Sequence, residues 1–198
     1  MRIGIVNYEM GNIRSLFNAL NYIGHKPKLV STKDEVDLCD IIVLPGVGAF
    51  QRAINQLRRK NLIQPIKKHV ESKKKIIGIC LGMQLFFENS LEFGDTKGFG
   101  FIKGKVMPFK DIIDLKIPHV GWNEISTINQ SFQEFENSYY FIHSFYCEPE
   151  NNEDILFKSS YGIEFCSGVI KKNIIGVQFH PEKSNKSGLS LLKKFLNE

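Results

Sequence analysis

One of the four cysteines in this 198-residue sequence lies in a setting that suits a nucleophile. Cys80 is the centre of the string Gly-Ile-Cys-Leu-Gly, with an apolar, strand-like run before it and a helix-like stretch, residues 83–88, after it. Flanking glycines permit the sharp strand-to-helix turn that presents a nucleophile. The positive end of the following helix would favour the reactive thiolate. A buried structural cysteine beside a glycine turn would give the same string, so the turn alone leaves both interpretations open.

A histidine and a glutamate follow another apolar run near the C-terminus. His180 comes directly after residues 174–179, and Glu182 stands two positions later, beyond Pro181. A cysteine nucleophile needs a base that carries a proton to the leaving amine, and that base needs a third group to fix its tautomer. A surface turn facing water would show the same spacing. Because Cys80 and His180 both end predicted core strands, and such strand ends form the active edge of an open α/β sheet, we expect them to meet.

A glycine-containing segment follows a third strand on the same edge. It reads Pro-Gly-Val-Gly-Ala-Phe at positions 45–50. Glycine allows a peptide to rotate and the backbone to approach a ligand closely. Amides near Val47 and Gly48, with that of Leu81 as a second donor, could stabilise the oxyanion of a tetrahedral intermediate. The alternatives are a plain turn or a phosphate loop, but the latter would need other glycine spacing and a Lys-Ser/Thr ending.

Alternating strands and helices in the first half of the chain must position these groups. Apolar runs predict strands at residues 2–7, 27–31, 40–44 and 75–80. Helical spacing of apolar residues covers 13–20, 50–57 and 62–72, and Gly24 is a plausible helix stop. Beyond about residue 95, short aromatic or β-branched segments predict mainly antiparallel strands near 99–109, 117–127, 139–147, 155–158 and 163–171. A last strand at 174–179 precedes a C-terminal helix.

These elements predict the fold class. We expect an α/β fold with an open, mostly parallel sheet, helices on both faces, and antiparallel strands added in the second half, as in a flavodoxin-like arrangement. The sequence shows no linker or repeat, so residues 1–198 are expected to form a single domain.

Composition and charge exclude several classes of protein. Hydrophobic residues make up 42%, and 26 Lys and Arg are offset by 21 Asp and Glu, so no basic stripe indicates nucleic-acid binding. No pair among the cysteines has C-x-x-C spacing, and we expect no metal, no cofactor and free thiols. No apolar stretch is long enough to cross a bilayer, and Met1 leads directly into a strand. We therefore expect a cytoplasmic protein with no membrane partner.

Three strings together resemble the class I (triad) glutamine amidotransferases. They are Gly-Ile-Cys-Leu-Gly-Met-Gln at 78–84, Phe-His-Pro-Glu-Lys-Ser at 179–184 and Pro-Gly-Val-Gly-Ala-Phe at 45–50. Further strings at 10–12, 118–123 and 140–144 are similar to glutaminase subunits that serve histidine biosynthesis. The resemblance runs along nearly the whole chain. It departs at Glu9, where many relatives carry glycine.

The resemblance implies a role for each matching residue. Cys80 would be the nucleophile, His180 the base and acid, and Glu182 its orienting group. The substrate would be glutamine, and Glu92 lies where the family often reads its amino end. The residues implied to hold the substrate are Gly46, Gln84, Glu92, His143, Ser144 and Phe145. The residues implied to stabilise the oxyanion are Val47, Gly48 and Leu81.

The resemblance also implies a partner. A (βα)₈-barrel cyclase would form a heterodimer with this chain and receive the ammonia, and it would activate the glutaminase by reorienting an oxyanion peptide. The candidate interface residues are Asn12, Trp122, Tyr140 and Lys183. A core position for the only tryptophan is the alternative reading of Trp122. A parallel group of subunits supplies ammonia to a nucleotide-sugar amidinating enzyme in surface-polysaccharide biosynthesis, with the same glutamine chemistry.

Three functions of other classes remain as rivals. A cysteine peptidase could use the same strand-to-helix turn, but Gln84 and the segment at 45–48 argue against it. A non-catalytic binding module would have lost one of the three proposed catalytic residues. A flavodoxin-like nucleotide binder would need a phosphate-binding loop after the first strand, where Tyr-Glu-Met-Gly stands instead.

Overall fold

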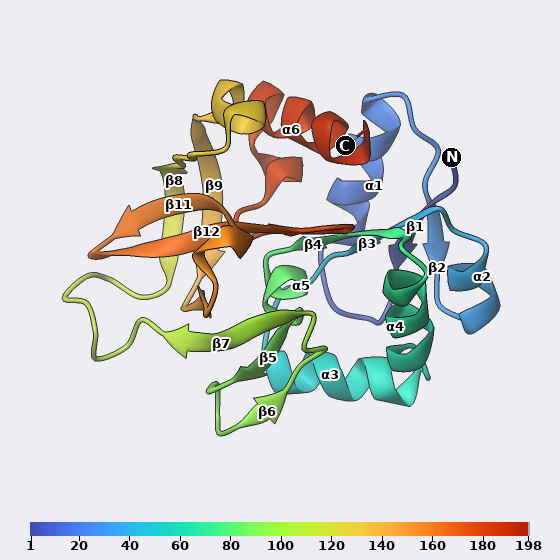
Figure 1. Cartoon of the computed structure of the whole chain (residues 1–198), viewed down its shortest axis with the longest axis horizontal. Helices are drawn as coiled ribbons and strands as arrows, with labels where there is room; N and C mark the ends of the chain where they lie inside the picture. The colour runs from blue at the N-terminus through green and yellow to red at the C-terminus, as the bar shows by residue number, and fades with distance from the viewer. Residues whose placement is uncertain (198) are drawn as a thin grey trace.

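A mixed sheet of eleven strands organises the chain, of which the computed structural model describes residues 1–197 (Figure 1). Five neighbouring strands run parallel in the order β2-β1-β3-β4-β13. Their bounds are β1 Ile3–Val6, β2 Lys28–Val30, β3 Ile41–Leu44, β4 Lys75–Ile79 and β13 Ile174–Val177. Every residue of β1, β3 and β13 is buried, as expected for parallel strands covered on both faces.

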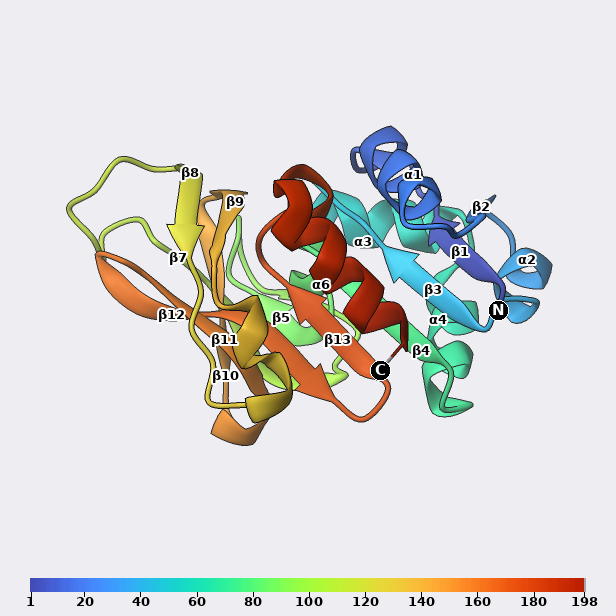
Figure 2. The ribbon, with the colours of Figure 1, turned by 90° about the horizontal axis from the view of Figure 1, so that it is seen from above.

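Helices cover both faces of this parallel region (Figures 1 and 2). Helices α1 (Ile13–Tyr22) and α6 (Asn185–Asn197) lie on one face, and α3 (Phe50–Arg59) and α4 (Ile63–Glu71) lie on the other. The alternation of side chains along each strand divides the core accordingly, because Val43 packs with α1 and α6 while Ile42 packs with α3 and α4. A short helix at the edge, α2 (Lys33–Asp37), begins with a capping box from Thr32 and Glu35.

The second half of the chain extends the sheet with mostly antiparallel strands. From β13 the order continues β12-β10-β7-β5-β6, and β11 pairs with β12. The bounds are β5 Phe87–Ser90, β6 Thr96–Lys97, β7 Ile102–Pro108, β10 Phe145–Pro149, β11 Ile155–Tyr161 and β12 Ile163–Lys171. One pair, β5 with β7, is parallel. The predicted fold class, a mostly parallel α/β sheet with antiparallel additions, is confirmed.

A separate two-stranded sheet stands beside the end of the main one. It consists of β8 (His119–Glu124) and β9 (Ser138–His143), which pair antiparallel. Three short 3₁₀ helices complete the chain: η1 Gln130–Phe135, η2 Asn152–Asp154 and η3 Pro181–Lys183. The predicted single strand at 139–147 is therefore wrong. It is interrupted at Ser144, so that β9 pairs with β8 while β10 joins the main sheet.

The helix predicted at residues 83–88 is also wrong. The helix after Cys80 is α5 (Leu81–Gln84), a single turn, and the chain becomes strand β5 at Phe87. The carbonyl of Phe86 accepts hydrogen bonds from the amides of Phe101 and Ile102. These bonds to a distant segment replace the hydrogen bond that the Phe86 carbonyl would have made within a longer helix. Both Phe86 and Phe87 are fully buried, which one face of a surface helix would not provide for consecutive residues.

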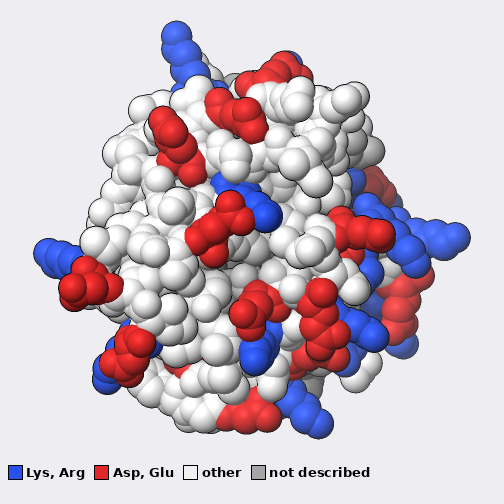
Figure 3. All heavy atoms as spheres, turned by 60° about the vertical axis from the view of Figure 1, so that its left-hand side comes forward, with Lys and Arg blue, Asp and Glu red and all other residues white. Residues whose placement is uncertain are grey.

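Charged side chains do not gather by sign on the face shown in Figure 3. Acidic and basic groups alternate there among uncharged surface. Within residues 1–197, no helix is both long and apolar enough to cross a membrane.

Two glycines beside the strand-to-helix turn allow a matched test of this packing. A Cβ at Gly82 would collide with the carbonyl oxygen of Leu44, whereas a Cβ at Gly176 would lie 2.8 Å from Cγ of Met83, a flexible side chain. We expect Gly82→Ala to lower the free energy of unfolding by about 3 kcal/mol and Gly176→Ala by about 1 kcal/mol, as measured by urea denaturation. Equal losses would contradict the close approach of α5 to the backbone of β3.

Candidate active site

Cys80 occupies the turn between β4 and α5 in a strained conformation. Its φ is +54° and its ψ is −112°, a region that non-glycine residues rarely adopt and that costs about 1–3 kcal/mol. Its amide donates to the carbonyl of Val177 at 2.7 Å, and its carbonyl accepts from the amides of Met83 and Gln84. The side chain is 5% exposed. Hydrogen bonds on both sides therefore hold a strained residue at the end of a core strand, as a nucleophile position requires.

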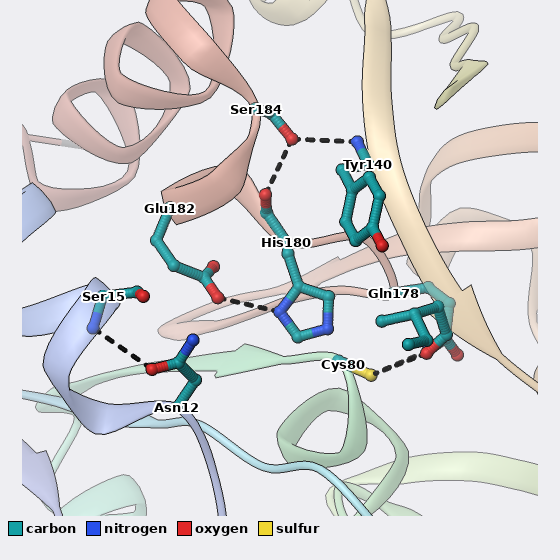
Figure 4. A network of polar contacts seen from close by, with 9 residues as sticks. Asn12, Ser15, Cys80, Tyr140, Gln178, His180, Glu182 and Ser184 are labelled. Atoms are coloured by element: carbon teal, nitrogen blue, oxygen red, sulfur yellow. Dashed lines mark hydrogen bonds and ion pairs between the residues drawn. The ribbon is translucent and has the colours of Figure 1, made fainter. Parts of the chain in front are cut away.

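His180 lies three residues after the end of the neighbouring strand β13, which stops at Val177 and not at the predicted residue 179, and it is 2% exposed. Its Nδ1 is 2.8 Å from Oε1 of Glu182, so the carboxylate fixes the ring. Its Nε2 is buried with no hydrogen-bond partner among residues 1–197, and Figure 4 shows that edge of the ring turned toward Cys80. The structure thus brings the three predicted catalytic residues together in the order that a triad needs.

Opposing effects act on the pKa of His180. Burial lowers it, but the negative charge of the Cys80 thiolate and the carboxylate of Glu182 outweigh burial and raise it to about 10. Two anionic groups flanking one ring favour the imidazolium. The arrangement therefore favours the protonated form of the His180 ring beside the sulfur.

The backbone of His180 is tied to strand β9. The amide of His180 donates to the carbonyl of Tyr140 at 2.9 Å. The hydroxyl of Ser184 donates to the carbonyl of His180 at 2.7 Å and accepts from the amide of Tyr140 at 3.0 Å (Figure 4). Because hydrogen bonds fix the peptide groups on both sides of His180, the position of its ring depends on β9.

A cavity of about 430 Å³ opens over Cys80. The predicted oxyanion residues that line it are Val47, Gly48 and Leu81. The predicted substrate residues that line it are Gln84, Glu92, His143, Ser144 and Phe145. Gly46 lies beneath this lining, where a Cβ would come within 2.5 Å of the hydroxyl of Tyr8. Gly46 is thus not among the residues that line the cavity, and its predicted contact with the substrate stays a prediction.

The oxyanion segment is held at its start by a buried tyrosine. The buried Tyr8 hydroxyl donates to the carbonyl of Pro45 at 2.7 Å. Further along, Val47 and Gly48 are exposed, and Gly48 has a φ of +101°. Leu81 is the first residue of α5, so its amide lacks a partner within the helix and is available to a ligand. Because α5 has a single turn, these free amides, and not a long helix dipole, provide the positive potential here.

Glu92 joins the cavity to helix α3. Its carboxylate accepts from the amide of Phe50 at 2.6 Å and caps a helix whose N-cap residue, Ala49, provides no side-chain hydrogen bond. Burial raises the pKa of Glu92, and the Phe50 amide partly offsets this effect. One carboxylate therefore both faces the cavity and anchors the end of the oxyanion segment.

Gln178 belongs to the site but escaped the sequence analysis. It is fully buried, and its Nε2 lies 3.6 Å from Sγ of Cys80. Its Oε1 accepts from Nε2 of Gln84 at 3.0 Å, and Gln84 also donates to the carbonyl of Phe145. A glutamine between Val177 and Phe179, inside an apolar strand-like run, was the available signal, because buried amides need partners.

Two buried histidines, His119 of β8 and His143 of β9, pair with each other across these strands. Nδ1 of His143 is 2.8 Å from the carbonyl of Phe145, which can only accept, so this nitrogen carries a proton. Nε2 of His143 must then accept from Nδ1 of His119, 2.9 Å away. Burial lowers the pKa of His143 to about 3 and that of His119 to about 4. Both rings are therefore neutral links in one directed chain of hydrogen bonds.

Three of the four predicted interface residues cluster on the outer face of β8 and β9. Trp122 is 51% exposed, so it is not a core residue, and its ring meets that of Tyr140 edge-on at 6.2 Å. Nζ of Lys183 lies 5.7 Å from the centre of the Tyr140 ring. Exposed Val120 and Ile142 pair across the same two strands. We call Val120, Trp122, Tyr140 and Ile142 the β8–β9 patch.

Asn12, the fourth predicted interface residue, lies apart from this patch. It is exposed and caps helix α1, accepting from the amide of Ser15 at 3.4 Å. Figure 4 shows this contact between Asn12 and Ser15. Among residues 1–197, no three His, Cys, Asp or Glu side chains are grouped to hold a metal ion.

Comparison with known proteins identifies relatives along nearly the whole chain. The family model described as glutamine amidotransferase class-I matches residues 4–198. The chain is 42% identical to imidazole glycerol phosphate synthase subunit HisH of Aquifex aeolicus, covering 98% of this chain and 96% of the relative. It is 43% identical, with the same coverage, to the subunit of that name from Sulfurimonas denitrificans.

Solved structures share the fold at lower identity. One described as a glutamine amidotransferase superposes with a TM-score of 0.78 at 16% identity, covering 100% of this chain and 98% of the other. PurLQS from Thermotoga maritima gives a TM-score of 0.76 at 21% identity, covering 99% and 97%. These likenesses support the architecture and carry no further argument about the site.

The buried histidine pair predicts a component of acid sensitivity. An unfolded histidine has a pKa of about 6.5, whereas folded His119 has one of about 4, so the unfolded state binds more protons as the pH falls between these values. Stability from this group is present above pH 6.5 and is lost toward pH 4. Between these pH values, we expect His119→Gln to reduce the slope of the unfolding free energy against pH by up to about 1.4 kcal/mol per pH unit. The free energy is measured by urea denaturation at each pH.

His25 provides the matched control for this measurement. It is half-buried in the loop between α1 and β2, whereas the histidine pair belongs to β8 and β9. We expect His25→Gln to leave the pH dependence of stability close to that of the unchanged chain. Equal slopes for the two variants would contradict a protonation-sensitive role for the buried pair.

Proposed function

The chain belongs to the class I glutamine amidotransferases, and from this premise we propose that it is the glutaminase subunit of an imidazole glycerol phosphate synthase in histidine biosynthesis. Full-length similarity to subunits of that name supports the pathway. The observation that carries the chemistry is the arrangement of Cys80, His180 and Glu182 beside one cavity. The sugar-amidinating alternative would use the same site, but the names of these relatives favour histidine biosynthesis.

The first half of the reaction forms a thioester. The thiolate of Cys80 attacks the side-chain amide carbon of glutamine, so a C–S bond forms and the carbonyl oxygen becomes an oxyanion. The amide of Leu81 and the amides near Val47 and Gly48 are the proposed oxyanion donors, each worth about 10²–10³ in rate. His180 donates its Nε2 proton to the amide nitrogen as the C–N bond breaks. Ammonia leaves, and a γ-glutamyl thioester remains on Cys80.

The second half restores the enzyme. Neutral His180 takes a proton from a water molecule whose oxygen attacks the thioester carbon. The C–S bond then breaks, the thiolate of Cys80 is regenerated, and glutamate is released. Glu182 stabilises the imidazolium in both halves and keeps Nε2 of His180 facing the sulfur. Glu92 is the proposed partner of the substrate's amino group, because it is an acidic side chain in the cavity lining.

A partner is required by the chemistry of the product. Ammonia released into water at neutral pH is mostly protonated and is lost as a nucleophile, so a synthase should receive it directly. The β8–β9 patch, with Lys183 at its edge, is the proposed docking surface for a (βα)₈-barrel cyclase. Aromatic groups in such a patch are common binding hot spots, and Lys183 could pair with a carboxylate of the partner. The partner would also control the Val47–Gly48 peptide.

The nucleophile is tested in the complex with the cyclase. We expect Cys80→Ala to lower glutamine-dependent product formation by at least about 10⁴-fold, since no thioester can form. Activity with added ammonium salt should remain. Cys39→Ala is the matched control, because Cys39 is also a buried cysteine but packs against Gly4 of β1. Retained glutamine-dependent activity in Cys80→Ala would refute the mechanism.

The partner is tested by recovery and by affinity. A pull-down from the native source should recover a barrel cyclase, and a sugar-modifying synthetase would refute the pathway. We expect Trp122→Ala to raise the Kd of the complex by about 10–100-fold, measured by titration calorimetry. Tyr22→Ala, at an 81% exposed aromatic residue on α1, should leave the Kd unchanged. Equal glutamine hydrolysis by the isolated chain and by the complex would contradict partner control.

A further inference from the structure

Gln178 contacts the sulfur of Cys80 but has no part in the steps described above. Its Nε2 lies 3.6 Å from Sγ, and its side chain is fully buried. The sulfur has another polar contact, 3.8 Å from the carbonyl oxygen of Ile142. His180 approaches from a third direction (Figure 4). Polar groups of different kinds therefore surround the nucleophile where it lines the cavity.

The amide of Gln178 has one orientation that satisfies its neighbours. The carbonyl of Phe145 can only accept hydrogen bonds, so Gln84 must present its NH₂ group there, at 3.2 Å. The same NH₂ group lies 3.0 Å from the Gln178 side chain, which must present its oxygen to it. The NH₂ group of Gln178 is then left facing the sulfur. The Phe145 carbonyl also accepts from Nδ1 of His143.

The two weaker contacts of the sulfur correspond to different protonation states. A carbonyl oxygen can only accept, so Ile142 suits the neutral thiol, whose S–H is a donor. An amide NH₂ can only donate, so Gln178 suits the thiolate. A largely buried anion needs such donors, and hydrogen bonds to charged groups are the stronger kind.

We propose that Gln178 is a further catalytic residue, which donates a hydrogen bond to the Cys80 thiolate and is held in that orientation by Gln84 and the carbonyl of Phe145. In the resting enzyme it stabilises the thiolate together with His180. In the second half of the reaction it stabilises the same thiolate as the C–S bond breaks. Its part in glutamine turnover rests on the proposed function, whereas its effect on the sulfur does not.

The test is the pH dependence of Cys80 alkylation by iodoacetamide in the full-length chain. Modification at Cys80 is followed by peptide mass spectrometry, so the other cysteines do not interfere. Gln178→Met keeps the length of the side chain and removes the donor. We expect the midpoint of the pH–rate profile of Gln178→Met to rise by about one pH unit. This shift corresponds to a roughly tenfold smaller equilibrium constant for ionisation of the thiol. Gln178→Glu, which places a carboxylate against the sulfur, should raise the midpoint further.

A second variant tests the orienting chain without touching the donor. Gln84→Met removes the group that fixes the Gln178 amide, so its midpoint should rise by less than that of Gln178→Met. This variant also decides the question if Gln178→Met does not fold. A midpoint equal to that of the unchanged chain in the folded variants would overturn the proposal.

Asn173→Ala is the control for a purely structural effect. The Asn173 amide donates to the carbonyls of Val70 and Lys74 at the far end of β13, so its loss removes comparable hydrogen bonds away from the sulfur. Its midpoint should stay unchanged although its stability falls. The same midpoint shift in Asn173→Ala and Gln178→Met would overturn the proposal. A shift specific to Gln178 in a chain without glutaminase activity would support it and count against the proposed function alone.

Discussion

The proposed mechanism places a negative charge on the buried sulfur of Cys80, and stabilising that charge is the constraint that the surrounding structure has to meet. The side chains of Cys80 and His180 are 5% and 2% exposed, so water contributes little to stabilising the thiolate–imidazolium pair. An uncompensated charge in such a place would cost several kcal/mol. Gln178 and His180 come from the segment that follows β13, Cys80 follows β4, and these strands are parallel neighbours. The parallel core is therefore what brings the charge and its compensating groups to one point.

Strand β9 connects this charged pair to the molecular surface. The peptide of Tyr140 bonds to His180 and to Ser184, while the Tyr140 ring belongs to the β8–β9 patch with Trp122. The same strand ends at His143, whose ring bonds to the carbonyl of Phe145 that also orients Gln84. Any displacement of β9 consequently acts on the base and on the amides around the sulfur together. A partner on the patch would have a direct mechanical route to the reacting groups.

The sequence was sufficient where local patterns decide structure. Continuous apolar runs indicated the parallel strands, and the position of Cys80 and His180 at their ends indicated that the two side chains would meet. It was insufficient where distant segments compete. The capture of the Phe86 carbonyl by residues near 101 ended the helix after one turn, and no local signal contains that pairing. Tyr8 was missed for the same reason, because its importance depends on its contact with Pro45. The amide of Gln178 in an apolar run was a local signal, but its contact with Cys80 was not visible in the sequence.

The oxyanion segment shows how one loop can be both anchored and adjustable. At its start, Pro45 is bonded to Tyr8, and Gly46 has no room for a side chain between Tyr8 and Leu81. At its end, the carboxylate of Glu92 caps Phe50. Between these fixed points lie Val47 and Gly48, which are exposed to the cavity. Rotation of a peptide is thereby confined to this short stretch, where glycine lowers its cost. The two glycines therefore have different roles: Gly46 allows close packing, and Gly48 allows a peptide to rotate.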